Sequence, residues 1–150
     1  MFGILVTLVY ALGSGYFVDN SGWYSSLRRP AWQPPDWVFG VIWPYNFLAL
    51  GFASWQLASG SRPGLHWVWV SLFAASVAAA LMWSYEFYRS RRLGRAARYL
   101  QVAAVLTVPV FALPWFESPL AGALLIPYQV WIVLAAGLST AYARLNGQGQ

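Results

Sequence analysis

The chain has 150 residues, of which 59% are hydrophobic and 9% are charged, and its net charge is +5. Soluble globular domains carry roughly 25% charged residues, so this composition indicates a single domain, residues 1–150, embedded in a membrane. Nine arginines, no lysine, four acids and one histidine are too few for a hydrolytic dyad, a metal cluster or a phosphate-binding site. The absence of cysteine excludes thiolate chemistry and Cys-ligated metals.

The apolar residues fall into five stretches, and a helix needs roughly 20 such residues to cross a bilayer. The first stretch is short and lacks the basic leader and small-residue cleavage site of a secretory signal, so we expect an uncleaved helix there. Short connections favour antiparallel neighbours. The sequence therefore predicts an all-α integral membrane protein, a bundle of five transmembrane helices with a cap loop at 19–36. The predicted spans are 2–18, 37–60, 65–88, 99–116 and 119–143.

The arginines are divided unequally between the two ends of such a bundle. Eight of the nine lie in the first loop, the third loop or the C-terminal segment, and Arg62 alone lies on the other side. By the positive-inside rule, the first loop and the C-terminus are predicted to be cytoplasmic and the N-terminus outside. The basic residues are thus explained by topology, not by nucleic acid. Binding of anionic lipid headgroups by the third loop is a compatible second interpretation.

Aromatic residues make up 19% of the chain, more than two interfacial belts require. We expect belt positions for four tryptophans near the outer interface, where indole rings favour headgroup depth: Trp55, Trp67, Trp69 and Trp115. Three others lie roughly 10–20 Å inside their predicted helices. Bulky packing between helices could account for any one of these three, but together they predict a ring-lined cavity: Trp43, Trp83 and Trp131.

The first loop reads WYSSLRRPAWQPPDWVF over residues 23–39. Its three prolines fix backbone dihedrals, so we expect a stiff, ordered cap. Asp36 lies where a negative charge suits the start of the second span. With Trp43 and Trp83 in the same half of the bundle, the cap predicts an aromatic pocket under an arginine-bearing lid. Such a site suits flat, mostly apolar ligands that carry carboxylates.

A few polar or small residues in the spans allow two interpretations. Glu86 is expected to form an interfacial pair with Arg89, three residues later, although an intramembrane carboxylate can also be functional. His66 is expected at headgroup level beside Trp67, the alternative being a ligand to a tetrapyrrole metal. The third span has a small-residue face, suited to packing inside the bundle or to a homodimer; it comprises Ala74, Ala75, Ala78, Ala79 and Ala80.

Two long motifs give the chain a family resemblance. The first loop and Trp43, WYSSLRRPAWQPPDWVFGVIW, resemble the WYxxLxKPxWxPPxWVFxxxW signature of the tryptophan-rich sensory protein and translocator protein family, TspO. The segment 127–146, PYQVWIVLAAGLSTAYARLN, is similar to the fifth helix of that family, PYxxWxxxAxxLNxxxxRLN. The resemblance implies a five-helix bundle, usually dimeric, that binds porphyrins and sterol-like or drug-like ligands in a cavity closed by the first loop.

Carried across position by position, the resemblance implies a set of ligand-binding residues and a separate sterol-contact motif. Two amides common in the family are replaced here, by Ala80 and Ser139, and the lysine of the loop is Arg29, which keeps the charge but changes its geometry. The implied cavity residues are Tyr24, Trp32, Pro34, Trp43, Trp83, Trp131 and Ser139, and the sterol-contact motif, which also fits a short proposed cholesterol pattern, is Leu138, Tyr142 and Arg144.

Three functions follow as hypotheses. The first is a sensor or translocator of porphyrin, tetrapyrrole or sterol-like ligands, without a required cofactor or catalytic residues. The second is an accessory subunit of a larger membrane complex, such as a pigment–protein complex. The third is light-dependent degradation of a bound porphyrin, ascribed in the family to cavity tryptophans. We favour a non-enzymatic role, because the spans contain no ordinary catalytic constellation.

Overall fold

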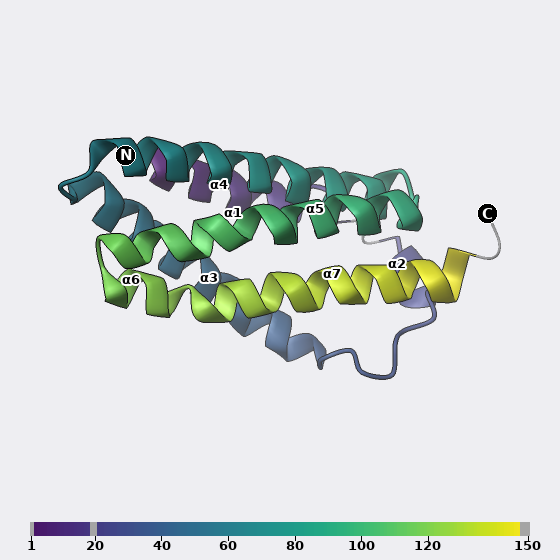
Figure 1. Cartoon of the computed structure of the whole chain (residues 1–150). Helices are drawn as coiled ribbons and strands as arrows, with labels where there is room; N and C mark the ends of the chain where they lie inside the picture. Colours follow the sequence, from purple (N-terminus) through teal and green to yellow (C-terminus); the bar gives the residue numbers. More distant parts are fainter. Residues whose placement is uncertain (1, 19–20, 148–150) are drawn as a thin grey trace.

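The computed structural model describes residues 2–18 and 21–147, and within these residues all regular structure is helical (Figure 1). Two elements depart from α-helical geometry: a π-helical turn, η1, continues α4, and a 3-10 turn, η2, continues α5. The elements are α1 Phe2–Tyr16, α2 Trp23–Ser26, α3 Asp36–Ser59, α4 Pro63–Ser84, η1 Tyr85–Arg89, α5 Leu93–Ala112, η2 Leu113–Phe116, α6 Pro119–Leu124 and α7 Ile126–Asn146.

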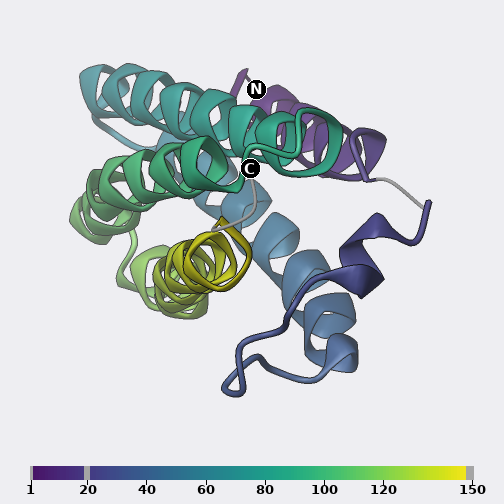
Figure 2. The same ribbon diagram turned by 90° about the vertical axis from the view of Figure 1, so that its right-hand side faces the viewer.

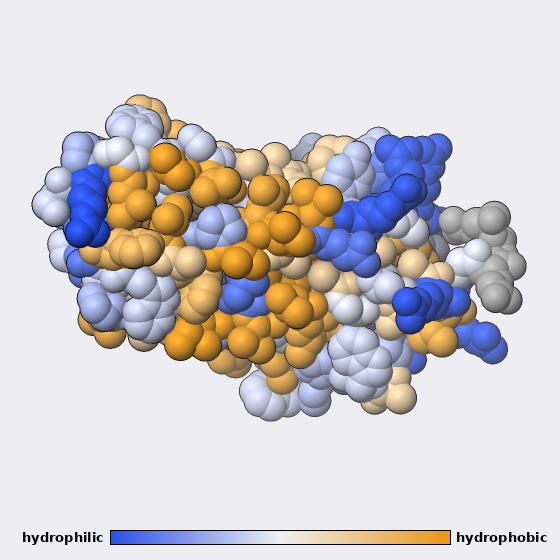
Figure 3. Space-filling view, viewed as in Figure 1, coloured by the Kyte–Doolittle hydropathy of each residue, from blue (hydrophilic) through white to orange (hydrophobic). Residues whose placement is uncertain are grey.

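Four helical segments are long and apolar enough to cross a membrane, which confirms the prediction of an all-α membrane protein. They are Asp36–Ser59, Pro63–Arg89, Leu93–Phe116 and Pro119–Asn146. The first helix, α1, is apolar but has only 15 residues, fewer than the roughly 17–25 that usually span a bilayer. On the face shown in Figure 3, the middle of the molecule is largely apolar, and most of the strongly hydrophilic residues lie towards its ends.

The long helices pack side by side, with α5 between α4 and α7 and with α1 against α3 and α4 (Figures 1 and 2). Segment 21–35, which includes α2, follows α1 and leads into α3 at the end of the bundle where α7 finishes (Figure 2). We call residues 21–35 the lid. The helix α3 begins at Asp36, the last residue of the predicted cap loop.

The fourth span begins earlier than the sequence indicated. Residues 93–98 were expected in a basic loop, but α5 starts at Leu93. The physical reason is burial on one helix face: Leu93, Ala96 and Ala97 are buried, while Arg95 and Arg98 are exposed. Arginine side chains can extend from the end of a helix to water, so the charged residues Arg95 and Arg98 did not indicate where α5 begins.

The expected partner of Glu86 is also corrected. Its side chain is buried, and the ion pair that it forms is with Arg95, whose Nη2 atom lies 2.9 Å from Oε1 of Glu86, and not with Arg89. Glu86 and Arg89 both lie in η1, where the π-helical turn changes the one-turn spacing that the i,i+3 argument assumed. The ion pair therefore joins η1 to α5 across the short loop.

One of the four expected belt tryptophans lies in the protein core. Trp69 is fully buried, and its Nε1 atom donates a hydrogen bond to the carbonyl oxygen of Val110 at 2.8 Å. Its ring packs on Phe73 with 4.9 Å between ring centroids. The alternation between Trp67, which is half exposed, and Trp69 follows from helical geometry, since residues two apart face opposite sides.

Candidate functional site

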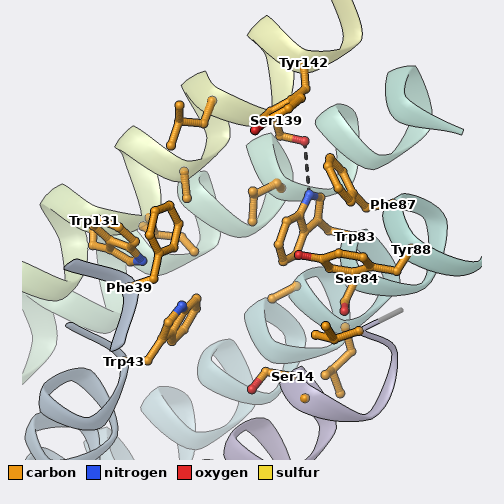
Figure 4. Close-up of a pocket in the computed structure, with 18 of the residues that line it drawn as sticks. Ser14, Phe39, Trp43, Trp83, Ser84, Phe87, Tyr88, Trp131, Ser139 and Tyr142 are labelled. Atoms are coloured by element: carbon orange, nitrogen blue, oxygen red, sulfur yellow. Dashed lines mark hydrogen bonds between the residues drawn. The ribbon is translucent and has the colours of Figure 1, made fainter. Parts of the chain in front are cut away.

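A cavity of about 330 Å³ lies between α1, α3, α4, η1, α5 and α7, under the lid (Figure 4). Its volume falls at the lower end of the range of roughly 300–1,000 Å³ for ligand pockets. The lining is mostly apolar and aromatic. The aromatic residues of its wall are Tyr10, Tyr24, Phe39, Trp43, Trp83, Phe87, Tyr88, Trp131 and Tyr142.

One-turn spacing places pairs of rings on the same helix face. Phe39 and Trp43 are four residues apart on α3, and Trp83 and Phe87 are four apart where α4 passes into η1. The ring of Phe39 meets that of Trp131 edge-on, with centroids 5.0 Å apart. Figure 4 shows these two groups of rings on either side of the cavity. The two groups provide facing surfaces against which a planar ligand can stack.

The two tryptophans on opposite walls differ in their hydrogen bonds. The Nε1 atom of Trp83 donates to Oγ of Ser139 at 3.1 Å (Figure 4). Trp131 is also buried, but its Nε1 atom has no partner in the protein, and neither does the hydroxyl of Ser84. A buried unpaired donor costs about 1–3 kcal/mol, so the Trp131 N–H is a hydrogen-bond donor that the protein itself leaves unused.

The lid is joined to α7 by two sets of hydrogen bonds. Tyr142 lies within hydrogen-bonding distance of Oε1 of Gln33 and of the Tyr24 hydroxyl. Near the end of α7, the Asn146 side chain accepts from the Arg28 amide at 2.9 Å and donates to the Arg28 carbonyl at 3.1 Å. These contacts hold the lid over the cavity.

The lid also carries a positive charge near the cavity. The Arg29 guanidinium lies 5.6 Å from the centre of the Tyr24 ring, and its Nη1 atom lies 3.5 Å from Oδ1 of Asp36. Both side chains of this ion pair are substantially exposed, so the interaction contributes little to stability.

Seven of the ten implied ligand-binding and sterol-motif residues line the cavity together: Tyr24, Trp43, Trp83, Trp131, Leu138, Ser139 and Tyr142. Trp32 and Pro34 do not line it. Trp32 is 54% exposed, and its ring lies against Gly137 on α7, where an added methyl group would come within 3.4 Å.

The three residues of the short sterol pattern do not share one face. Leu138 and Tyr142 are one turn apart, buried, and line the cavity. Arg144 lies two residues further along, is exposed, and is absent from the cavity wall. The aromatic member of the pattern therefore faces inward and contacts the lid.

Several cavity residues were missed from the sequence, including Tyr10, Ser14, Gln33 and Tyr88. Ser14 comes from α1, for which the sequence offered no functional argument. Extending the helical spacing from the deep tryptophans would have found Phe39, Phe87 and Ala135, because each lies four residues from one of them. No comparable signal marks Gln33, since it lies in the lid.

The described part of the chain contains no group of three His, Cys, Asp or Glu side chains that could hold a metal ion. His66 is buried in the first turns of α4, with its ring centroid 5.4 Å from that of Trp67. The cavity wall on α4 starts at Ala80, roughly 21 Å further along the helix. His66 is therefore remote from the cavity and cannot ligate a group bound inside it.

The long apolar helices and the aromatic cavity define a helical integral membrane protein with a mostly apolar internal pocket. Residues 3–145 match the TspO/MBR family. The chain belongs to this family, which confirms the resemblance noted in its two motifs.

Curated relatives are similar over nearly their whole length. The tryptophan-rich sensory protein of Cereibacter sphaeroides is 30% identical, with 95% of this chain and 91% of the relative covered. The translocator protein of Sus scrofa is 35% identical, with 93% and 87% covered. The tryptophan-rich protein TspO of Chlorobaculum tepidum is 32% identical, with 96% and 92% covered.

Proposed function

We propose that this protein binds a flat, largely apolar ligand of the porphyrin or sterol-like class in the aromatic cavity and acts as its sensor or translocator. The observation that carries the proposal is the unpaired N–H of Trp131 in a wall of aromatic rings. The family, and the names of the relatives as sensory protein and translocator protein, support the same role.

A ligand with an acceptor at its edge fits this wall best. A carboxylate or carbonyl could accept from Trp131, while the hydroxyl of Ser84 offers a second polar contact on the opposite wall. At the lid, a ligand carboxylate could replace Asp36 as the partner of Arg29, since bidentate arginine–carboxylate pairs are strong and directional. A tetrapyrrole with propionate groups has both features.

Ligand access requires the lid to move, because Tyr24 and Gln33 belong to both the lid and the cavity wall. The hydrogen bonds from Tyr142 and Asn146 would be broken in the open state. Each contributes about 1 kcal/mol net, so opening by thermal motion is feasible. The lid would thus control the rate of binding, and stacking inside would set the affinity.

In the membrane, we propose five crossings, with α1 as the shortest, the N-terminus outside, and the lid and C-terminus in the cytoplasm. The packing of α1 against α3 and α4 supports its inclusion as a span, and the distribution of arginines supports the orientation. Ala75 and Ala78 are exposed on α4, where a second copy could approach closely to form a homodimer.

The test is a titration of the purified full chain with protoporphyrin, followed by tryptophan fluorescence, beside the Trp43→Phe/Trp131→Phe double variant. We expect saturable quenching in the parent protein and at least tenfold weaker binding in the double variant. Absence of saturable quenching by folded protein at micromolar porphyrin would contradict the proposal and favour the accessory-subunit hypothesis.

A further inference from the structure

A second hollow lies on the outside of the bundle, along α5. It has a volume of about 290 Å³ and is lined by Arg95, Arg98, Tyr99 and Val102. None of these residues lines the aromatic cavity. We call these four residues the α5 groove.

The charge of the α5 groove is positive and incompletely neutralised. Arg95 pairs with the buried Glu86, but a guanidinium has five N–H donors, and one carboxylate oxygen does not occupy them all. Arg98 is exposed, and no acidic side chain in the described segments lies within ion-pair distance of it. Residues 86–98 contain five arginines and one acid, so the groove attracts anions.

The exposed face of α5 changes from basic to aliphatic along one line. Arg95 and Arg98 are followed at helical spacing by Val102, Val105 and Val108, which are 51%, 70% and 52% exposed. In a membrane helix these valines face acyl chains. Val102 belongs to the groove and lies roughly 6 Å along the helix axis from Arg98, so the groove is at the boundary between headgroups and hydrocarbon.

We propose that the α5 groove binds the phosphate of an anionic membrane phospholipid, with the acyl chains along the valine line. Arg98 and the free donors of Arg95 contact the phosphate, and the Tyr99 hydroxyl supplies a neutral donor. A soluble phosphate would share only the polar half of this site. The apolar line that continues from the groove therefore favours a lipid as occupant. Glu86 opposes the anion, but its charge is compensated by Arg95.

The experiment is native mass spectrometry of the full chain in detergent, titrated separately with dioleoyl phosphatidylglycerol and dioleoyl phosphatidylcholine. We expect tighter binding of phosphatidylglycerol, and a roughly fivefold loss of that binding in Arg98→Gln, the effect of one basic residue near an anionic surface. Phosphatidylcholine binding should not change in this variant. Arg98→Lys should retain most of the preference, because it keeps the charge.

The matched control is Arg144→Gln, which removes an exposed arginine from the end of α7, outside the groove. It should leave phosphatidylglycerol binding unchanged. Equal binding of the two lipids, an equal loss in Arg98→Gln and Arg144→Gln, or displacement of the lipid by an equal concentration of glycerol phosphate would each overturn the proposal. Thermal unfolding of each variant verifies that it is folded. These readouts are independent of any ligand in the aromatic cavity.

Discussion

Trp131 and Trp83 face one cavity from two helices, yet only the N–H of Trp83 has a protein partner, Ser139. Serine here replaces an amide common in the family, and its hydroxyl is already engaged by Trp83. The hydrogen-bonding capacity that remains for a ligand on this wall is thus concentrated on Trp131. In the proposed complex, the acceptor of the ligand would therefore point towards α7.

Replacing Trp131 by Phe keeps an aromatic ring and removes the N–H. Affinity for a carboxylate-bearing porphyrin should fall about five- to tenfold, corresponding to one hydrogen bond of about 1–1.5 kcal/mol. The free energy of unfolding of the ligand-free protein should change by less than about 1 kcal/mol, because no protein hydrogen bond is lost and the removal of a buried unpaired donor offsets the reduced packing of the smaller ring. Fluorescence titration and thermal unfolding measure the two quantities.

Trp83→Phe is the comparison for that substitution. It breaks the bond to Ser139 and leaves a buried hydroxyl without this donor, so it should lower the stability of the ligand-free protein by about 1 kcal/mol. Equal affinity of Trp131→Phe and the parent protein for porphyrin would show that the unpaired N–H does not contact the ligand.

At the scale of elements, close approach depends on a few glycines. Gly122 on α6 faces the indole of Trp115, and an added methyl group would lie 2.4 Å from the ring. Gly122→Ala should therefore destabilise the fold by about 1–3 kcal/mol, the usual effect of overpacking. Gly51 on α3 has nothing within 4 Å of that position, so Gly51→Ala should be neutral or stabilising. Unfolding in denaturant that ranked the two variants in the opposite order would contradict this packing.

The contact between the lid and α7 gives a second prediction at this scale. Asn146→Ala removes both hydrogen bonds to the backbone of Arg28. Amide hydrogen exchange in residues 21–35 should become about tenfold faster, because the lid opens more often, while exchange in the middle of α5 should not change. Unchanged exchange in the lid would show that Asn146 does not hold it closed.

The positions of the long helices were largely predictable from the sequence, because the apolar stretches coincide with these helices and the polar breaks with the connections between them. The start of α5 was not predictable, because Arg95 and Arg98 resemble loop residues in the sequence. In the structure they lie on the exposed face of a helix whose other face is buried. The prediction that Trp69 lies in an interfacial belt was wrong for a related reason. Trp67 and Trp69 are close in the sequence, but only the face of α4 that carries Trp69 is covered by other helices, and the sequence does not show which face is covered.

The cavity wall was predictable where a motif or helical spacing marked it, as for Trp43, Trp83 and Trp131. The way in which the lid closes over the cavity was not predictable from the sequence. The contact of Tyr142 with Gln33 joins residues 109 apart in the chain, and no local pattern encodes such a pair. The inward direction of Tyr142 and the outward position of Trp32 likewise follow only from the path of the lid across α7.

At the scale of the whole molecule, one end of the bundle combines the lid, the α5 groove and most of the arginines (Figures 1 and 3). Ligand access and lipid contact would therefore occur at the same membrane surface, which the positive-inside rule assigns to the cytoplasm. In the proposed function, a ligand enters the cavity beneath the lid, which would make the lid the element that controls binding.

The central claim, that a ligand reaches the aromatic cavity beneath the lid, is tested most directly by locking the lid. The chain has no cysteine, and the Asn146 side chain contacts the Arg28 backbone, so Arg28→Cys/Asn146→Cys adds one thiol pair at this contact, and a disulfide between the two would link the lid to α7. Protoporphyrin should bind the reduced form and fail to bind the oxidised form, with binding restored by a reductant. Equal, saturable binding by both forms would contradict the account.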